Sequence, residues 1–190
     1  MLPTPIIGKI DYEKVYEPSE DSFLLLDCFE QEKDFIQAAF KESIPFVTEI
    51  GTGSGIVTTF IAKNVLPKAM FLATDINPHA CKTVIETMLF NPPYVPASEI
   101  PEIPTQDEDP VWLDLALVGG EDGMVVTWKV LDCLEQTLSS NGIAYILFCA
   151  RNKPESVAEI MRERGWNVEV VIHRKAGWEV LSVLKFSKGK

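Results

Sequence analysis

The stretch over 46–75 constrains the fold of this 190-residue chain more than any other. An apolar run leads into a glycine-rich turn over 51–55, a helical pattern follows over 56–64, and a second apolar run covers 69–74. Strand, helix and strand in this order are typical of a parallel α/β unit. The sequence therefore predicts an α/β fold built around this unit.

The remaining segments fit around that unit. We expect a single domain over 1–190, with an N-terminal helical segment over 1–45 and a core over 46–190. The patterns predict one or two helices within 17–44, helices over 78–87, 124–138 and 154–164, a buried strand over 143–150, a Pro- and acid-rich loop over 95–114, and an antiparallel hairpin formed by 166–173 and 178–186.

Composition excludes several classes of function. The net charge of −11 repels phosphate and anionic lipid, so we expect no direct nucleic-acid binding and no membrane association. Four cysteines without a Cys-x-x-Cys pair and only two histidines give little support for a metal site. No apolar run approaches the ~20 residues of a membrane span, and the N-terminus has no pattern of a signal peptide. We expect reduced thiols, no metal and a cytoplasmic protein.

The glycine turn and Asp75 together indicate a nucleoside ligand. Glycines at a strand-to-helix turn let the backbone approach a ligand closely, beside the free N–H groups of a helix N-terminus. Asp75 ends the next apolar run, about twenty residues later, where a carboxylate can accept the hydroxyls of a ribose. A plain tight turn and a helix N-cap before Pro78 are the structural alternatives. The combination favours a ligand that contains adenosine.

A third motif, Asn91-Pro92-Pro93-Tyr94, follows another short apolar run. The prolines fix the backbone and donate no hydrogen bonds. The Asn91 side chain and the Pro92 carbonyl then present two rigid acceptors for a planar NH₂ group, on whose plane Tyr94 can stack. An ordinary proline turn is the alternative. The motif suits an amide or exocyclic amine that awaits an electrophile.

These motifs carry a family resemblance. Glu49-x-Gly-x-Gly-x-Gly, Asp75 and the Asn-Pro-Pro-Tyr motif resemble class I S-adenosylmethionine-dependent methyltransferases, and the third motif resembles those that methylate amide or amine nitrogen. The flanking segments 15–27, 74–78, 119–123 and 176–186 resemble eukaryotic HemK-like glutamine methyltransferases. The resemblance implies a Rossmann-like, mostly parallel sheet with helices on both faces and an antiparallel C-terminal hairpin.

The resemblance also implies an activity and partners. It implies methylation of the side-chain amide of the glutamine in the Gly-Gly-Gln motif of the class 1 translation release factor, in the cytoplasm or nucleus. It implies S-adenosyl-L-methionine as cofactor and a small zinc-binding activator subunit in a heterodimer. The implied cofactor-binding residues are Ser22, Glu49, Gly51, Gly53, Asp75 and Asn91. The implied substrate-binding residues are Asn91, Pro92, Pro93 and Tyr94, of which Asn91, Pro92 and Tyr94 are catalytic.

The chain departs from that family at one place. Only fifteen residues separate Asp75 from Asn91, whereas the family pattern places a helix, a further strand and a connection there. A parallel crossover alone takes at least ~10–12 residues. We therefore expect that roughly two to three dozen residues, including one strand with the acid that contacts adenine, are missing.

Two other functions remain open at the level of sequence. An N6-adenine nucleic-acid methyltransferase would use the same Asn-Pro-Pro-Tyr motif, although the acidic charge disfavours it. A noncatalytic binding module, formed by a degenerate methyltransferase fold, would follow if the missing segment had abolished the chemistry. Cofactor binding separates the module from an enzyme, and the methylated product separates the two enzymes.

Overall fold

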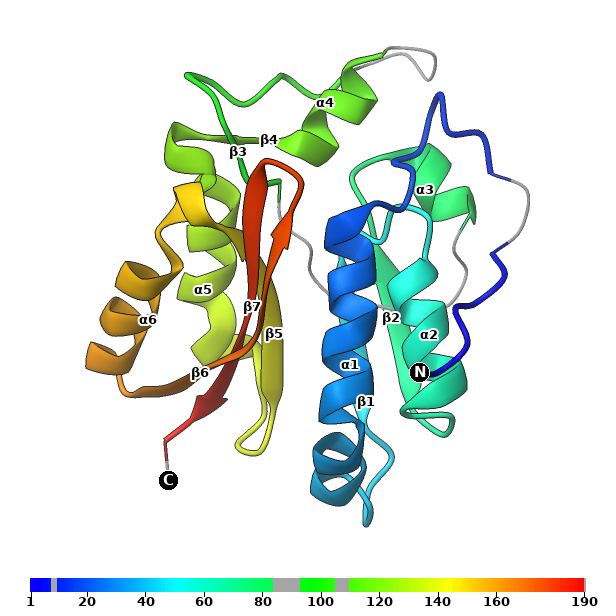
Figure 1. Ribbon diagram of the computed structural model, residues 1–190, viewed down its shortest axis with the longest axis vertical. Coiled ribbons are helices and arrows are strands. Elements are labelled where there is room, and N and C mark those ends of the chain that lie inside the picture. Colours follow the sequence, from blue (N-terminus) through cyan, green and yellow to red (C-terminus); the bar gives the residue numbers. More distant parts are fainter. Residues whose placement is uncertain (8–9, 84–92, 105–109, 190) are drawn as a thin grey trace. The chain divides into compact units, whose positions relative to one another are not determined.

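The computed structural model describes residues 1–7, 10–83, 93–104 and 110–189, and it has an α/β fold (Figure 1). This confirms the predicted fold class. The chain divides into two compact units. The first comprises 1–91 and 102–116, and the second comprises 92–101 and 117–190. The expectation of one domain over 1–190 stays a prediction.

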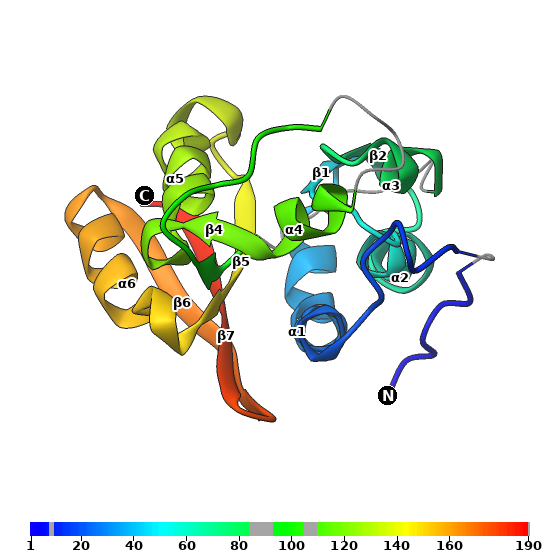
Figure 2. The same cartoon turned by 90° about the horizontal axis from the view of Figure 1, so that it is seen from above.

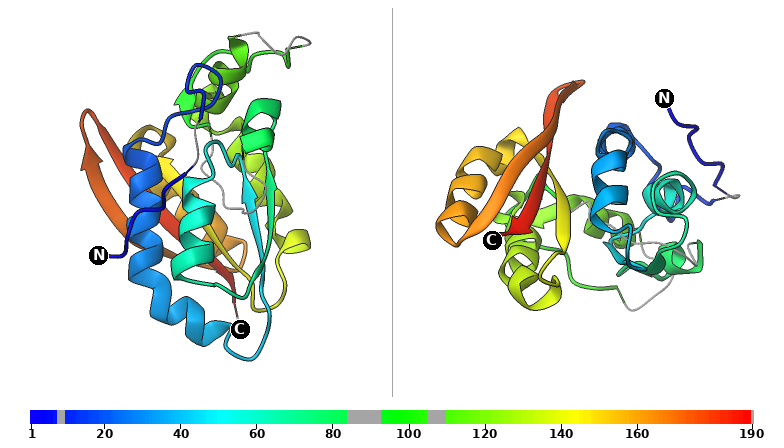
Figure 3. Two further views of the ribbon diagram at one scale, coloured as in Figure 1. Left: turned by 90° about the vertical axis from the view of Figure 1, so that its right-hand side faces the viewer. Right: turned by 90° about the horizontal axis from the view of Figure 1, so that it is seen from below.

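The first unit is built on the predicted strand, helix and strand. β1 (Phe46–Ile50) and β2 (Met70–Thr74) pair in parallel, in register from Phe46 opposite Met70 to Ile50 opposite Thr74. Helix α2 (Ile56–Asn64) connects them, with the bounds that the sequence predicts. Helix α1 (Glu20–Ala39) is the one long helix within 17–44, and it lies beside α2 on one face of the strand pair (Figure 3).

The helices and strands of this unit close over an apolar core. Its fully buried side chains include Leu24, Leu25 and Phe29 of α1 and Phe60 of α2. The opposite face of the strand pair carries Phe46, Met70 and Leu72 with exposed fractions of 60%, 61% and 47%. Parallel sheets are normally covered on both faces, so this apolar face is unusual.

Helix α3 (Pro78–Thr83) follows β2 and begins at Pro78 as predicted. The predicted continuation of this helix to 87 lies outside the described residues. Most of the place where we expect a missing strand, between Asp75 and Asn91, lies outside them too. Within the described ranges β2 pairs with β1 alone. The missing strand therefore stays a prediction.

The second unit contains an antiparallel sheet of order β5-β7-β6, formed by Ile143–Cys149, Glu179–Lys188 and Trp166–Ala176. The buried strand and the C-terminal hairpin are thereby confirmed. The first hairpin strand continues to Ala176, beyond the predicted end at 173, because the tight turn lies at Gly177 and Trp178. Gly177 adopts a φ of 58°, which glycine tolerates without strain.

Two helices lie on the same side of this sheet (Figure 2). They are α5 (Val125–Thr137) and α6 (Pro154–Glu163), within one residue of their predicted bounds. α6 buries Val157, Ala158 and Met161. Spacings of one, three and four residues place these side chains on one helix face, which packs against the sheet.

The predicted loop over 95–114 is wrong at both of its ends. β3 (Val95–Pro96) pairs in parallel with β4 (Val118–Gly120). Helix α4 (Val111–Leu117) begins directly after Pro110, and it buries Trp112 and Leu115. The three-residue spacing of these apolar side chains favours a helix in spite of the acidic and proline-rich surroundings.

Short 3₁₀ helices complete the second unit. Residues 119–123 form the end of β4 and then η1 (Glu121–Gly123). A second one, η2 (Ala150–Asn152), follows β5 directly. In the part of the chain that the structure describes, no helix combines the length and the apolar character that crossing a membrane requires.

Candidate functional site

The glycine-rich turn joins β1 to α2, as the sequence predicts. The N–H groups of Gly51 and Thr52 donate to the Thr74 carbonyl at distances of 2.8 and 3.1 Å, which holds the turn against the end of β2. Gly53 has a φ of 50°, and a side chain built on it would meet no atom within 4 Å. The turn therefore presents open backbone surface beside the N-terminus of α2.

Glu49, at the end of β1, is buried behind this turn with 3% of its surface exposed. The Thr52 hydroxyl donates to its Oε2 at 2.9 Å, and the Thr58 hydroxyl of α2 donates to the same oxygen. Burial raises the pKa of Glu49 well above its usual range, and the nearby charge of Asp75 acts in the same direction. Glu49 therefore links the strand, the turn and the helix from inside.

Asp75 lies against the glycine turn. Its Oδ2 accepts the N–H of Gly53 at 2.8 Å, and its Oδ1 accepts the N–H of Asn77 at 2.8 Å. Burial raises the pKa of this carboxyl. The spacing in the sequence thus brings Gly53 and Asp75 together, and the alternative of a local turn at Asp75 is present in the same structure.

Asn77 connects Asp75 to the N-terminal segment, a role that the sequence analysis missed. Its Nδ2 donates to the Lys14 carbonyl at 2.7 Å, and its Oδ1 accepts the N–H of His79 at 2.9 Å. Asn77 is buried. The only available signal was its position within the segment 74–78 that carries the family resemblance.

Ser22 lies in the first turn of α1 and is buried. Its hydroxyl donates to the Asp21 carboxylate at 3.3 Å, and the other carboxylate oxygen of Asp21 accepts the Tyr16 hydroxyl at 3.1 Å. Ser22 is thereby oriented by its own helix, and its implied contact with a cofactor stays a prediction.

The Asn-Pro-Pro-Tyr motif is described only in its second half. Asn91 and Pro92 lie outside the described residues. The Tyr94 hydroxyl donates to Oε2 of Glu179, at the start of β7, at 3.4 Å. Glu179 is a second residue that the sequence analysis did not assign to the site, although it belongs to the resembling segment 176–186.

The loop over 119–123 packs directly against this motif. A side chain on Gly119 would overlap the Pro93 carbonyl oxygen, and a side chain on Gly123 would overlap the Tyr94 carbonyl oxygen. Glycine is required at both positions because the two backbones touch. The backbone of Pro93 and Tyr94 therefore lies in direct contact with the backbone of Gly119 and Gly123.

The cysteines and the other potential metal ligands do not gather. Within the described ranges no three side chains of His, Cys, Asp or Glu lie close enough together to hold a metal ion. All four cysteines are free thiols, two buried (Cys28 and Cys149) and two exposed (Cys81 and Cys133).

Comparison with known proteins identifies relatives over nearly the whole chain. The mouse protein named methyltransferase HEMK2 is 32% identical over 219 aligned positions, which cover 98% of this chain and 97% of the relative. The human protein of that name is also 32% identical, covering 96% and 94%. The eRF1 methyltransferase catalytic subunit mtq2 of Schizosaccharomyces pombe is 32% identical, covering 97% and 95%. A scan against protein-family models found no match.

The fold also matches a solved structure. The E. cuniculi Mtq2–Trm112 complex, described as responsible for methylation of the eRF1 translation termination factor, contains a chain of similar fold, with a TM-score of 0.66 and 24% identity. The match covers 93% of this chain and 99% of that chain. It supports the class I methyltransferase fold.

The alignments are longer than this chain. The one with the mouse relative runs over 219 positions, so at least 29 of them, the excess over 190 residues, have no residue of this chain opposite. The excess is at least 21 for the human relative and at least 35 for the S. pombe relative. These relatives therefore contain two to three dozen residues that this chain lacks.

Proposed function

Because this chain belongs to the family of HEMK2 and eRF1 methyltransferase catalytic subunits, we propose that it methylates the glutamine of the Gly-Gly-Gln motif in the class 1 translation release factor. The observation that carries this function is 32% identity over nearly the full length of three such relatives. The chain is a protein-glutamine N-methyltransferase, and it requires a methyl donor.

The proposed donor is S-adenosyl-L-methionine. The first unit fits such a ligand: Gly53 leaves open space, and the Asp75 carboxylate at its side has acceptor capacity for ribose hydroxyls. We assign donor binding to Ser22, Glu49, Gly51, Gly53, Asp75 and Asn91.

When bound, the donor supplies an electrophilic methyl carbon on a sulfonium sulfur. The glutamine amide nitrogen forms a C–N bond to this carbon as the C–S bond breaks, and the nitrogen then loses a proton. We assign Asn91 and Pro92 the role of accepting the N–H groups of that amide, which favours the positive charge that develops on nitrogen. Pro93 stiffens the motif, and Tyr94 packs on the amide plane.

The proposed assembly is a heterodimer with a small zinc-binding activator subunit. The similar chain of known structure is part of the Mtq2–Trm112 complex, which supports a partner of this type. We propose that residues 1–190 act as one methyltransferase domain in this assembly. The substrate is a translation factor, so we place the reaction in the cytoplasm.

Nucleic acid is the less favoured substrate. The net charge of −11 opposes binding to a phosphate backbone, whereas the neutral side chain of a glutamine carries no such penalty. The competing proposal of a noncatalytic module rests on the residues that the relatives contain and this chain lacks.

The test is methyl transfer by the full chain co-expressed with its activator subunit. We expect mass spectrometry to find methylglutamine at the Gly-Gly-Gln motif, and a release factor with that glutamine replaced by alanine to stay unmodified. Asn91→Ala should lower kcat by about 10²–10³, the loss typical of one preorganised polar contact. Donor binding without methylation of the release factor would support the module instead, and methylation of adenine in its place would support the other enzyme.

A further inference from the structure

The second unit contains a buried amide that the proposed chemistry does not use. We propose that Asn152 is a positioning residue, which holds the Pro93–Tyr94 end of the Asn-Pro-Pro-Tyr motif in the geometry that methyl transfer requires. Its effect on the rate rests on the proposed function. The contacts on which the positioning depends are independent of that function.

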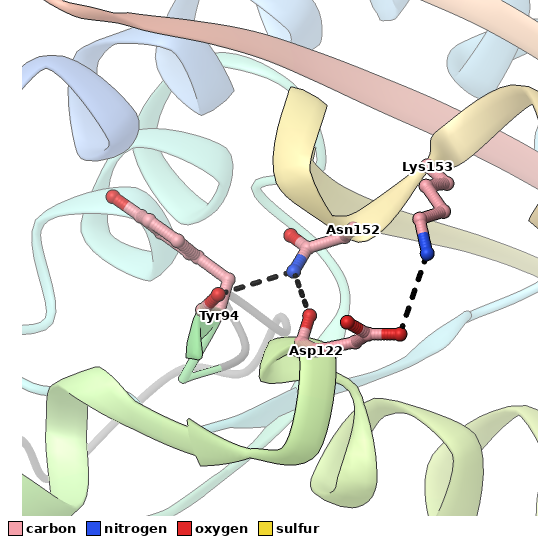
Figure 4. A network of polar contacts seen from close by, with 4 residues as sticks. All are labelled: Tyr94, Asp122, Asn152 and Lys153. Carbon is pink, nitrogen blue, oxygen red and sulfur yellow. Dashed lines mark hydrogen bonds and ion pairs between the residues drawn. The ribbon is translucent and has the colours of Figure 1, made fainter. Parts of the chain in front are cut away.

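The side chain of Asn152 connects three segments (Figure 4). Its Oδ1 accepts the N–H of Cys149, at the end of β5, at 2.9 Å. Its Nδ2 donates to the carbonyl of Tyr94 at 3.1 Å and to the carbonyl of Asp122, in η1, at 2.9 Å. Asn152 is 3% exposed. One buried side chain thus connects the sheet, Tyr94 of the motif and the loop over 119–123, which we call the glycine loop.

The arrangement suits an amide and no other side chain of this size. Two carbonyl oxygens face Asn152 Nδ2 and one N–H faces its Oδ1, which matches the two donors and the acceptor of asparagine. A carboxylate in its place would direct oxygen at two carbonyls in a buried site. A hydroxyl would be too short to reach all three partners.

The surrounding backbone leaves no room for adjustment. A side chain on Gly123 would overlap the Tyr94 carbonyl, and its Cβ would lie 2.8 Å from Asn152 Nδ2. Asp122 is one of two non-glycine residues with positive φ among the described residues, at 53°, and this conformation belongs to the loop whose carbonyl Asn152 binds. Pro93 and Tyr94 are therefore held between the glycine loop and the Asn152 amide.

The neighbouring ion pair between Lys153 and Asp122 does not hold Pro93 and Tyr94 in place. Lys153 Nζ lies 3.4 Å from Asp122 Oδ2, with the two side chains 68% and 66% exposed. Exposed pairs of this kind contribute little because water competes for both charges. The buried amide is therefore the group to change.

The positions that the motif assigns to the reaction lie two and three residues before Tyr94. Catalysis of this kind depends on alignment, and a misplacement of about 1 Å costs on the order of 100-fold in rate. We therefore expect Asn152→Asp to lower kcat about 100-fold, with the affinity for the methyl donor unchanged. Asn167→Asp is the matched control, because the exposed Asn167 amide also donates to a backbone carbonyl, that of Lys188, at 3.3 Å.

The dependence of kcat on pH distinguishes a positioning role of Asn152 from a role in the stability of the whole molecule. A protonated carboxyl at 152 regains one donor for the two carbonyls, so the kcat of Asn152→Asp relative to the wild type should rise as the pH falls. Wild-type kcat in this variant would overturn the proposal. A parallel loss of donor affinity would also overturn it, since that would show that Asn152 supports the whole molecule.

Two further measurements keep the proposal testable if the first variant or the assay fails. If Asn152→Asp does not fold, Asn152→Ser replaces the amide, without adding charge, by a hydroxyl too short to reach all three partners, and failure of both variants to fold overturns the positioning role. If the wild type transfers no methyl group, the proposed function has failed, but fluorine NMR of the 3-fluorotyrosine-labelled chain still reports the anchoring. The Tyr94 signal, assigned with Tyr94→Phe, should shift in the Asn152 variant and not in Asn167→Asp. An unchanged signal overturns the proposal.

Discussion

The glycine turn of the first unit is bound by a carboxylate, that of Asp75, whereas the Pro93–Tyr94 segment of the second unit is bound by an amide, that of Asn152. Asp75 accepts the N–H groups of Gly53 and Asn77, and a side chain on Gly53 would meet no atom within 4 Å. Beside Asn152 stand backbone carbonyls that need donors, and a side chain on Gly123 would overlap the Tyr94 carbonyl.

The difference separates two tasks that a transferase must combine. Open space beside acceptors is what a region needs if it is to bind a ligand. Tight backbone contacts are what a region needs if it is to hold a reacting group in place. The predictions below test this contrast, beginning with the largest expected effect.

Gly123→Ala should lower the free energy of unfolding by about 3 kcal/mol or more. The left-handed backbone costs about 1–2 kcal/mol for a residue with a Cβ, and the overlap with the Tyr94 carbonyl forces repacking at a cost of about 1–3 kcal/mol. Gly53→Ala and Gly177→Ala are the controls, because both have positive φ and open space. Urea unfolding should show only the strain of about 1–2 kcal/mol in these two. Equal losses of unfolding free energy in all three variants would show that the backbone around Gly123 is packed no more tightly than that around Gly53.

Glu49→Gln should change how stability depends on pH. Burial raises the pKa of Glu49 in the folded chain, so between about pH 4.5 and that raised pKa the folded state holds a proton that the unfolded state has released. The wild type therefore loses stability relative to Glu49→Gln as the pH rises through this window, by at most about 1.4 kcal/mol per pH unit. Urea unfolding over a pH series measures the slope.

The control for this prediction is Glu159→Gln, an exposed glutamate of α6. Its stability curve should run parallel to that of the wild type. A wild-type curve that rises relative to Glu49→Gln in the same window would show that the ionised form of Glu49 is the stabilised one.

Asp75→Asn should lower the free energy of unfolding by about 1–2 kcal/mol and weaken donor binding about tenfold. An amide offers one acceptor oxygen, so either Gly53 N–H or Asn77 N–H loses its partner. Calorimetry with the donor and urea unfolding measure the two effects. Asp132→Asn, at an exposed carboxylate of α5, is the control and should change neither. Unchanged donor affinity in Asp75→Asn would separate Asp75 from the binding site.

Lys153→Gln should have the smallest effect, below about 0.5 kcal/mol. It removes the exposed ion pair with Asp122 and leaves the Asn152 hydrogen bonds in place. Urea unfolding measures the difference at low and moderate salt. A loss larger than that of Asp75→Asn would mean that charge, and not the buried amide, holds the glycine loop.

The sequence could predict the part of the site that lies at the ends of the two parallel strands. Parallel strands end at the same edge of a sheet, so the spacing between Gly53 and Asp75 predicts their contact, which is present at 2.8 Å. The helix at Val111–Leu117 was missed because proline and acidic residues outweighed the spacing of two apolar side chains. No spacing predicts that Asn77 reaches Lys14, 63 positions away, or that Asn152 reaches Tyr94, 58 positions away.

The amino-acid order alone determined the α/β class, the bounds of α2 and the glycine turn, since periodicity and turn chemistry act over a few residues. It also indicated the family, because each of the family's motifs lies in one continuous segment of the chain. Only the tertiary structure decided which carbonyls meet Asn77 and Asn152 and why Gly119 and Gly123 cannot carry side chains. Those contacts join distant segments, and their partners exist only after the core has brought the backbones together.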